Sequence, residues 1–370
     1  MTENDNHHKS ALHVNDGVNQ PEATNKAAIE RFKKSKRRLL SADEHVKGIL
    51  SGDRMVLSKA ITLVESRNPG HHQLAQEIIG QCLPHSGNAV RIGITGVPGV
   101  GKSTFIEALG KYLTSNNHKL AVLAIDPSSS RTKGSILGDK TRMEELSVDE
   151  NAFIRPSPSA GSLGGVARKT RESIILCEAA GFDVIFVETV GVGQSEIAVH
   201  SMVDFFLLLM LAGAGDELQG IKRGIMEMAD AIFINKADGD NLKNARRAQS
   251  EYKNALHLFP PTQSGWLPKV DVCSSKTRDG IPEVWKTISE YVGFTRESGY
   301  FEEKRREQQD LIMYETINEG LKSHFYANDA VKQKLPEMME ALRNDKISSY
   351  VAAQKLMDLY FESIRKNPSA

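Results

Sequence analysis

Short, nearly continuous apolar runs alternate with stretches of helical periodicity between residues 88 and 296. The runs expected to be strands are Ala89–Thr95, Leu120–Ile125, Val184–Glu188, Phe205–Ala212, Ala231–Asn235 and Val270–Cys273. Strands without polar alternation are typical of parallel sheets that helices cover on both faces. The alternation therefore predicts an α/β fold with a doubly wound, mostly parallel sheet.

The regions that flank this domain carry helical periodicity without strands. Residues 41–87 are expected to form an N-terminal helical segment, and residues 297–370 a C-terminal helical arm. One apolar stripe of the arm consists of Leu311, Tyr314, Ile317, Leu321 and Phe325. A stripe outside the main core must pack on the domain or on a second copy of the chain.

Residues 1–40 are polar, end in a basic run and show no apolar periodicity, which predicts a disordered tail. Its residues His7, His8 and His13 could bind a metal, although histidines in an unstructured tail are the more common outcome. The sequence assigns no function to residues 1–30.

Charge and cysteine content narrow the class of protein. The 370 residues include 47 Lys+Arg and 47 Asp+Glu, and this balance argues against a nucleic-acid-coating protein. Cys82, Cys177 and Cys273 have neither metal-ligand spacing nor the pattern of a disulfide framework, which indicates a reducing compartment. Phe205–Ala212 is far shorter than the roughly 20 residues of a membrane span, and the N-terminus resembles neither a secretory signal nor a transit peptide. We therefore expect a cytoplasmic protein without a membrane partner.

The first expected strand runs into a loop with the pattern G-x-x-x-x-G-K-[ST]. Its residues are Gly96, Val97, Pro98, Gly99, Val100, Gly101, Lys102, Ser103 and Thr104. Glycines let backbone N–H groups turn toward phosphate oxygens, and the following helix directs its positive end to the same place. In such a loop Lys102 reaches the β- and γ-phosphates and the Ser103 hydroxyl coordinates Mg²⁺. A chance glycine-rich turn would lack the flanking strand and helix, so the context favours a nucleotide site.

The expected strand Ala231–Asn235 ends in the pattern N-K-x-D, formed by Asn235, Lys236 and Asp238. A carboxylate at this place accepts hydrogen bonds from the ring N–H and the exocyclic amine of guanine, a pair of donors that adenine lacks. We predict that Asp238 reads guanine, that Asn235 holds the loop and the ring, and that the Lys236 stem covers one face of the base. The loop expected to close over the other side, although it is weak as a signal on its own, contains Ser274, Ser275 and Lys276.

Three acidic residues end expected strands or lie in the loops that follow them. Glu188 has the position of a Walker-B acid that holds a metal-bound water, and Gly191 shortly after it could offer its N–H to the γ-phosphate. Asp126 ends the second strand, and Asp139 lies in the loop beyond it. Either aspartate could bind Mg²⁺ or orient the attacking water, although Asp126 is equally well explained as a turn or helix-cap residue.

Six segments in this order resemble one family: GVPGVGKST, AIDPSSS, GSILGDKTRM, FVETVGVGQSE, LAGAGDELQGIK and NKAD. They are similar to the methylmalonyl-CoA mutase-associated GTPases of the MeaB type, called MMAA in animals and ArgK in older usage, which are SIMIBI-class P-loop GTPases. The resemblance covers nearly the whole alternating domain and extends more loosely into the flanking helices.

The resemblance implies a GTP-hydrolysing metallochaperone that gates adenosylcobalamin delivery to an acyl-CoA mutase and lets damaged cofactor leave. It implies that Lys102 and Ser103 hold phosphate and Mg²⁺, that Asp126, Asp139 and Glu188 serve the Mg²⁺ site, and that the C-terminal helices form a homodimer. It also implies a mobile switch that reports GTP or GDP to the mutase, with the residues Asp216, Glu217, Gln219 and Lys222. The small residues Ala212–Gly215 before that segment fit a switch, but equally a solvated loop that opens a helix.

Two other functions remain open at this stage. A GTPase chaperone that itself binds nickel or another metal would need a Cys/His ligand set, and the sequence shows none outside the histidines of the tail. A P-loop kinase would need an acceptor site, and the N-K-x-D pattern argues against it. Because no arginine finger is evident in the loops, we expect slow intrinsic hydrolysis.

Overall fold

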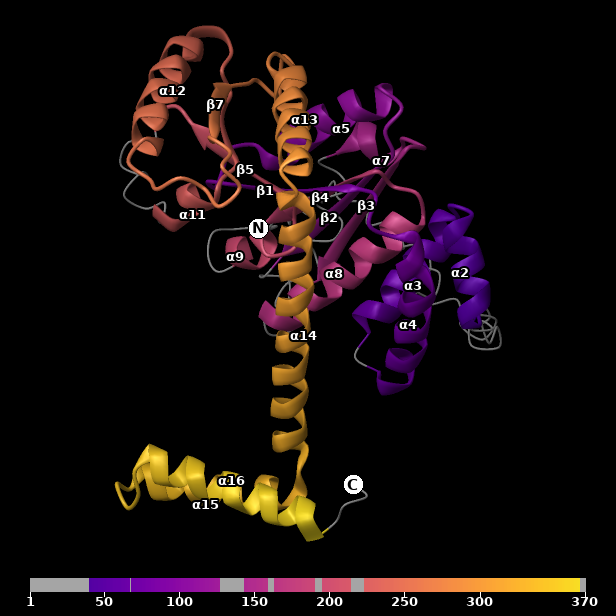
Figure 1. Cartoon of the computed structure of the whole chain (residues 1–370), viewed down its shortest axis with the longest axis vertical. Coiled ribbons are helices and arrows are strands. Elements are labelled where there is room, and N and C mark those ends of the chain that lie inside the picture. Colours follow the sequence, from indigo (N-terminus) through magenta and orange to yellow (C-terminus); the bar gives the residue numbers. More distant parts are fainter. Residues whose placement is uncertain are drawn as a thin grey trace, which may run out of the picture. The chain divides into compact units, whose positions relative to one another are not determined.

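A seven-stranded parallel sheet forms the centre of the chain, with the strand order β3-β2-β4-β1-β5-β6-β7 (Figure 1). The computed structural model describes residues 40–66, 68–126, 143–158, 163–189, 195–213 and 223–366. The strands are β1 Val90–Gly96, β2 Leu120–Asp126, β3 Ala152–Pro158, β4 Val184–Thr189, β5 Phe205–Leu211, β6 Ala231–Asn235 and β7 Lys269–Val272. The predicted doubly wound α/β fold is confirmed.

The predicted strands all occur, with bounds within one residue of expectation, but the sequence analysis missed β3. This strand contains Pro156 and Pro158, which cannot donate a backbone hydrogen bond. Proline is tolerated here because β3 is an edge strand that pairs only with β2, in a register that joins Leu120 to Ala152.

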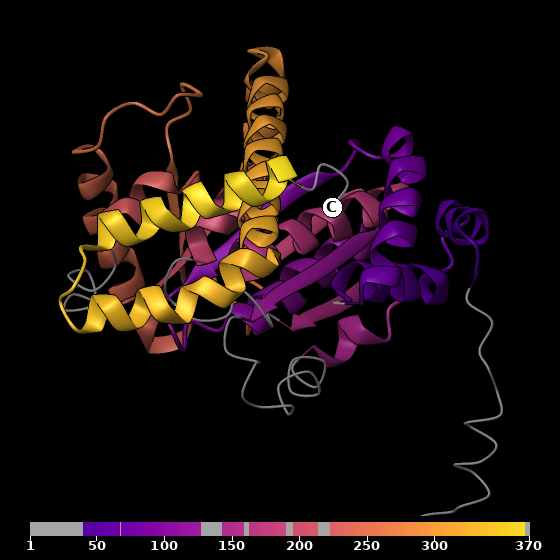
Figure 2. The ribbon, with the colours of Figure 1, turned by 90° about the horizontal axis from the view of Figure 1, so that it is seen from below.

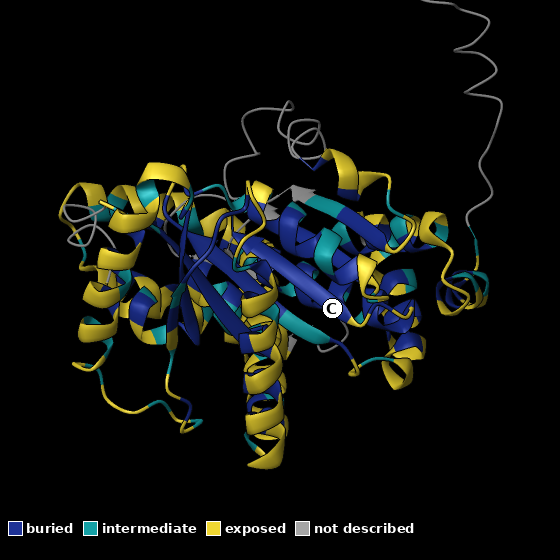
Figure 3. Cartoon of the chain, turned by 90° about the horizontal axis from the view of Figure 1, so that it is seen from above, coloured by how far each residue is buried: buried dark blue, intermediate teal, exposed yellow. Residues whose placement is uncertain are grey.

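Two separate hydrophobic cores lie under the helices on the two faces of the sheet. Ile92 and Ile94 of β1 belong to the core under α5 Lys102–Ser115, α12 Leu242–Leu256 and α13 Ile281–Glu297. Ile185 and Val187 of β4 belong to the other core, under α8 Leu163–Ala179 and α9 Ser195–His200. The strands are accordingly buried along most of their length (Figure 3).

Three helices precede the sheet and pack against α8. They are α2 Ala42–Leu50, α3 Arg54–Glu65 and α4 Pro69–Cys82, followed by the 3₁₀ turn η1 Leu83–His85. Asp53 caps α3, since its carboxylate accepts hydrogen bonds from the N–H groups of Met55 at 2.8 Å and Val56 at 3.1 Å. Ile49, Leu57 and Ile61 are fully buried in the core that includes α8.

The C-terminal helices are α14 Tyr300–Ala327, α15 Asp329–Arg343 and α16 Ser349–Lys366. α15 lies within the predicted helical arm, and its apolar residues Val331, Leu335, Met338 and Leu342 recur at helical spacing, although it also contains Pro336. α15 and α16 lie side by side around a small core of Val331, Met338, Ala352 and Leu356 (Figure 2). The described residues also include the short elements α7 Glu144–Ser147, α11 Arg223–Met228 and η2 Gly239–Asn241. None of the described helices has the length and apolar character needed to cross a membrane.

The predicted stripe on α14 is only partly covered. Phe325 packs against the α15–α16 core, but Leu311, Tyr314, Ile317 and Leu321 are 41–61% exposed. Exposed apolar residues continue on the other two helices, at Met339, Tyr350, Val351, Met357 and Phe361. Apolar surface on this scale is typical of a protein interface.

The first turns of α14 are anchored at the amino ends of the strands by buried polar groups. The Arg305 guanidinium donates to both carboxylate oxygens of Asp204, at 2.8 and 2.7 Å, and to the carbonyl oxygen of Ala89 at 2.6 Å. Asp204 also accepts from the N–H of Arg91 at 2.8 Å and is 2% exposed. The charge of Arg305 therefore has a buried partner that water cannot replace.

We expect Asp204→Ala to lower the free energy of unfolding by about 3 kcal/mol, because it leaves the Arg305 charge buried without its carboxylate. The measurement is urea denaturation. The control is Glu251→Ala, which breaks an exposed pair with Arg247 on α12 and should cost about 0.3 kcal/mol. Equal losses for the two variants would contradict a buried anchor.

Candidate functional site

The glycine-rich loop lies at the carboxyl end of β1, where the chain enters α5. β1 stands between β4 and β5, and the chain crosses from β1 over β4 to reach β2, so this is the switch point at which open α/β sheets bind ligands. Gly99 and Gly101 have φ values of +74° and +91°, a region that favours glycine. A Cβ on Gly96 would lie 2.4 Å from the carbonyl oxygen of Leu209, so no side chain fits there.

Lys102 is the first residue of α5, and its side chain folds back over the loop. Its Nζ donates to the carbonyl oxygen of Gly96 at 2.9 Å. Burial lowers the pKa of Lys102 from its usual value, whereas the negative charges of Glu188 and Glu196 act in the opposite direction. The ammonium is thus bonded to a loop carbonyl oxygen at the place where the P-loop pattern puts phosphates.

Asn235 joins the phosphate loop to the loop after β7. Its Nδ2 donates to the carbonyl oxygen of Val100 at 2.8 Å. Its Oδ1 accepts from the backbone N–H of Ser275 at 3.1 Å and from the Ser275 hydroxyl at 2.8 Å. Asn235 is 1% exposed, so each of these bonds is protected from water. Asn235 thus joins the two loops through buried hydrogen bonds, and its expected contact with the base stays a prediction.

Lys236 and Asp238 follow Asn235 and face the same two loops. Lys236 has a φ of +60° and its Nζ donates to the carbonyl oxygen of Gly99 at 2.8 Å. The half-buried Asp238 accepts a 2.5 Å bond from the hydroxyl of Ser274, whose oxygen in turn accepts from the N–H of Thr277. Ser274 therefore fixes the rotamer of the carboxylate expected to read the base, and the neighbouring Lys276 is exposed.

Glu188 is the acidic residue that the structure places beside the phosphate loop. It is 4% exposed and lies opposite Ile94 of β1 in the strand register. Next to it, the Thr189 hydroxyl donates to the Thr95 hydroxyl at 2.9 Å, which ties the ends of β4 and β1 together. Asp126 ends β2, but its side chain is outside the description. Asp139, Gly191, Asp216, Glu217, Gln219 and Lys222 also lie outside the described residues.

The donor types in this corner fit a hard divalent cation. The hydroxyl of Ser103, in the first turn of α5, and the buried carboxylate of Glu188 are both oxygen ligands of the kind that Mg²⁺ prefers. In the part of the chain that the structure describes, no three His, Cys, Asp or Glu side chains gather as a metal cluster. A cation here would accordingly be shared with a bound phosphate.

The sequence analysis gave no role to Glu196, the second residue of α9. It is 1% exposed, and its charge raises the pKa of Lys102. The signal in the sequence was its place shortly after the Walker-B position, on a helix that follows β4.

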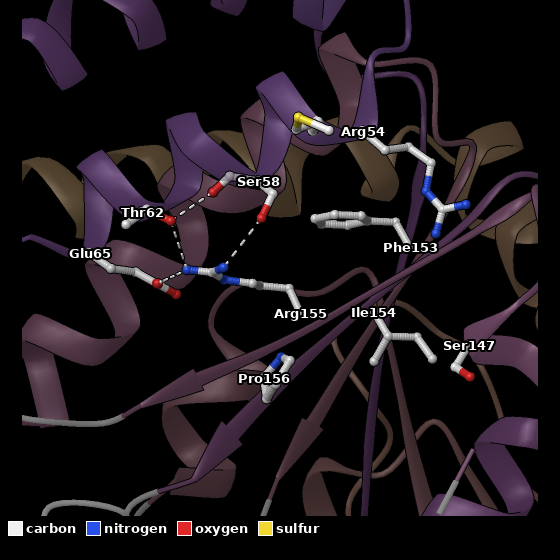
Figure 4. Close-up of a pocket in the computed structure, with 10 residues that line it drawn as sticks. Arg54, Ser58, Thr62, Glu65, Ser147, Phe153, Ile154, Arg155 and Pro156 are labelled. Atoms are coloured by element: carbon white, nitrogen blue, oxygen red, sulfur yellow. Dashed lines mark hydrogen bonds and ion pairs between the residues drawn. The ribbon is translucent and has the colours of Figure 1, made fainter. Parts of the chain in front are cut away.

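A cavity of about 600 Å³ lies away from this site, between α3 and the edge strand β3. Arg155 crosses it and donates to Glu65, to Thr62 and to the hydroxyl of Ser58 (Figure 4). Its lining includes no residue of the phosphate loop or of the N-K-x-D strand end. We interpret these contacts as the brace between α3 and the sheet edge.

The glycine-rich loop at the switch point and the braced N-K-x-D strand end define the class of protein: this is a P-loop GTPase. A protein of Mycobacterium tuberculosis that carries the name "Probable GTPase" is 48% identical to this chain, and the match covers 86% of this chain and 96% of the relative. The GTPase ArgK of Escherichia coli is 44% identical over 85% of the chain and 95% of the relative. The mouse mitochondrial protein called methylmalonic aciduria type A homolog is 46% identical over 85% of the chain and 78% of the relative.

A solved structure, described as a LAO/AO transport system kinase, superimposes with a TM-score of 0.69 at 38% identity, covering 86% of this chain and 98% of that one. The family model described as methylmalonyl-CoA mutase-associated GTPase MeaB matches residues 57–330. The chain belongs to this MeaB family of GTPases.

Replacing Lys102 with alanine should abolish GTP turnover and weaken GTP binding by about 100-fold or more, because it removes the cation that faces the phosphates. Calorimetry and phosphate release measure the two effects. Lys243→Ala, at an exposed lysine of α12, is the control and should behave as wild type. Normal turnover by Lys102→Ala would remove the loop from the mechanism.

Asp238→Asn should move the nucleotide preference from GTP toward XTP, because an amide can donate to the additional oxygen of xanthine. We expect kcat/KM for GTP to fall by about 100-fold or more while XTP becomes a substrate. The exposed neighbour Asp240 provides the control, and Asp240→Asn should keep the preference for GTP. If Asp238→Asn also keeps it, another residue reads the base.

Proposed function

We propose that the chain is a Mg²⁺-dependent GTP hydrolase that acts as a chaperone for an adenosylcobalamin-dependent acyl-CoA mutase, methylmalonyl-CoA mutase or a relative. It would gate delivery of adenosylcobalamin and protect or reactivate the mutase. The observation that carries the proposal is the MeaB family match over residues 57–330, which includes the phosphate loop, the N-K-x-D strand end and the first turns of the arm.

The proposed division of labour follows the geometry of the site. The loop from Gly96 to Thr104 would bind the phosphates through its N–H groups, with Lys102 exchanging the Gly96 carbonyl for phosphate oxygens. Asp238, held by Ser274, would read guanine, while the Lys236 stem covers the ring. Asn235, Ser275 and Lys276 would close the opposite wall of the base pocket.

The hydrolytic roles are proposals from the sequence pattern and the position of one buried acid. Ser103 and Glu188 would hold Mg²⁺, Glu188 through a water, and the ion would neutralise charge on the β- and γ-phosphates. Asp126 and Asp139 would complete the site or orient the attacking water, and Gly191 would donate to the γ-phosphate. Asp216, Glu217, Gln219 and Lys222 would form the switch read by the mutase.

The C-terminal arm would form a homodimer. Supporting this are the exposed apolar residues of α14, α15 and α16, which the described part of the chain leaves uncovered. The three cysteines are free and buried, in keeping with a reducing, cytoplasmic location. We propose no nucleic-acid partner and no membrane partner.

The alternative functions receive less support. A chaperone that carries another metal would need a ligand cluster, and the described residues contain none. A kinase would consume nucleotide only when an acceptor is added, whereas a hydrolase releases phosphate from GTP alone. Assays with GTP and with ATP, without an acceptor, separate these functions.

The test of the mutase partner uses a methylmalonyl-CoA mutase and adenosylcobalamin, and exploits the base-reading aspartate. We expect wild-type protein to bind the mutase and to alter adenosylcobalamin transfer in a manner that differs between a non-hydrolysable GTP analogue and GDP. The Asp238→Asn variant should show the same difference with xanthine nucleotides only.

Size-exclusion chromatography follows the complex, and the absorbance of the cobalamin follows the transfer. If neither complex formation nor transfer depends on the nucleotide bound, the chaperone role is wrong, even though GTP hydrolysis stands.

A further inference from the structure

The turn Ser201–Asp204 joins α9 to β5. It lies at the amino ends of the strands, whereas the phosphate loop lies at their carboxyl ends. We refer to these residues as the α9–β5 turn. Lys304 donates to the carbonyl oxygen of Asp204 at 2.8 Å, and Gln308 donates to the carbonyl oxygen of Val203 at 2.9 Å. With the Arg305–Asp204 pair, three residues of α14 hold this turn.

Arg171 of α8 adds a contact that reaches both α9 and the arm. Its Nη2 donates to the Ser201 hydroxyl at 2.7 Å, and its Nη1 donates to Glu315 of α14 at 2.6 Å. The Ser201 hydroxyl in turn donates to the carbonyl oxygen of Ala198 in the last turn of α9, at 2.9 Å. One side chain therefore links the end of α9 to a position well along α14.

The ion pair between Arg171 and Glu315 is partly buried. The Arg171 side chain is 7% exposed, and in the described residues Glu315 is the carboxylate within ion-pair distance of it. Losing Glu315 while the guanidinium stays buried would leave the cation with the Ser201 hydroxyl as its hydrogen-bond acceptor among the described residues, which is costly. A cavity of about 500 Å³ borders the contact. There, Arg171 Nε and Gln308 Oε1 have no hydrogen-bond partner among the described residues, so the contact is not closely packed and its side chains have room to rearrange.

The other end of α9 reaches the nucleotide site. Glu196, in its first turn, is 1% exposed, and its negative charge partly offsets the lowering of the Lys102 pKa by burial. Between the two ends, Val199 packs directly on β1, where a Cβ on Gly93 would lie 2.8 Å from it. α9 therefore fits closely against the strand that leads into the phosphate loop, and a shift at Ser201 reaches Glu196 through one short, rigid helix.

We propose that Arg171 is a positioning residue for GTP hydrolysis, which sets the place of α9 on β1, the strand that leads into the phosphate loop, and makes it depend on α14 through Glu315. The exposed arm and the phosphate site would then be coupled: whatever displaces α14 changes the hydrolysis rate. This inference concerns hydrolysis itself and does not depend on the mutase as partner. A purely structural brace would instead affect stability without affecting the catalytic step.

The test begins with Glu315→Gln, which keeps the shape of a partly exposed side chain and removes the charge that Arg171 needs. We expect kcat for GTP to fall three- to tenfold with KM within twofold of wild type, measured well below the thermal midpoint of the variant so that partial unfolding does not contribute. Glu319→Gln, one turn further along α14 at a glutamate without an ion pair among the described residues, is the matched control and should leave kcat unchanged.

A double-mutant cycle then assigns the effect to Arg171. In an Arg171→Met background, Glu315→Gln should cause no further loss, because the link is already broken. Ser201→Ala, which removes a single hydroxyl, takes the place of Arg171→Met if that variant does not fold. An unchanged or higher kcat for Glu315→Gln, a loss confined to KM, or additive losses in the cycle would each overturn the proposal.

Discussion

The buried amide of Asn235 is the interaction on which the candidate site depends most directly. The P-loop and the N-K-x-D strand end come from segments 135 residues apart, and in a GTPase the distance between two such segments must suit a single nucleotide. The Asn235 side chain fixes that separation, since it donates to the phosphate loop and accepts twice from the loop after β7. Losing any of these bonds would leave a buried donor or acceptor unpaired. The bonds therefore stabilise the fold and also favour one arrangement of the two loops.

This brace works because the sheet beneath it does not deform. Strands β1, β4, β5 and β6 are buried along nearly their whole length, and β4 has apolar residues in both cores, so their carboxyl ends stand at fixed places. At those ends, glycine is required where the backbone approaches closely: at Gly96 a Cβ would meet the carbonyl oxygen of Leu209. The same sheet carries the amino-end anchor of α14, where Asp204 receives Arg305. The sheet therefore carries the Asn235 brace at the carboxyl ends of its strands and the Asp204–Arg305 pair at their amino ends.

The sequence predicted what depends on local periodicity and short motifs, and missed what depends on distant pairing. Apolar runs revealed β4 and β5, and the P-loop pattern placed Lys102 correctly at the start of α5. β3 escaped because its prolines oppose a strand assignment, and only its edge position reconciles them with the sheet. The Arg171–Glu315 pair joins residues 144 positions apart, and no pattern of spacing indicates it. The charge of Glu196 likewise acquires its meaning only when α9 packs against β1.

Rigidity also decides how the arm and the phosphate site can influence each other. A close-packed core resists gradual deformation, so a displacement passes through it as the movement of whole helices or strands. β5 is hydrogen-bonded to a strand on each side, whereas α9 is a six-residue helix held to the sheet by side-chain contacts, among them Val199 on β1 and His200 against Phe206 of β5. A short helix held in this way shifts more readily than a strand bonded on both sides. Arg171 holds α9 at one end, and the carboxylate that neutralises its buried charge belongs to the arm. The free energy of this ion pair therefore depends on how the arm lies against the domain.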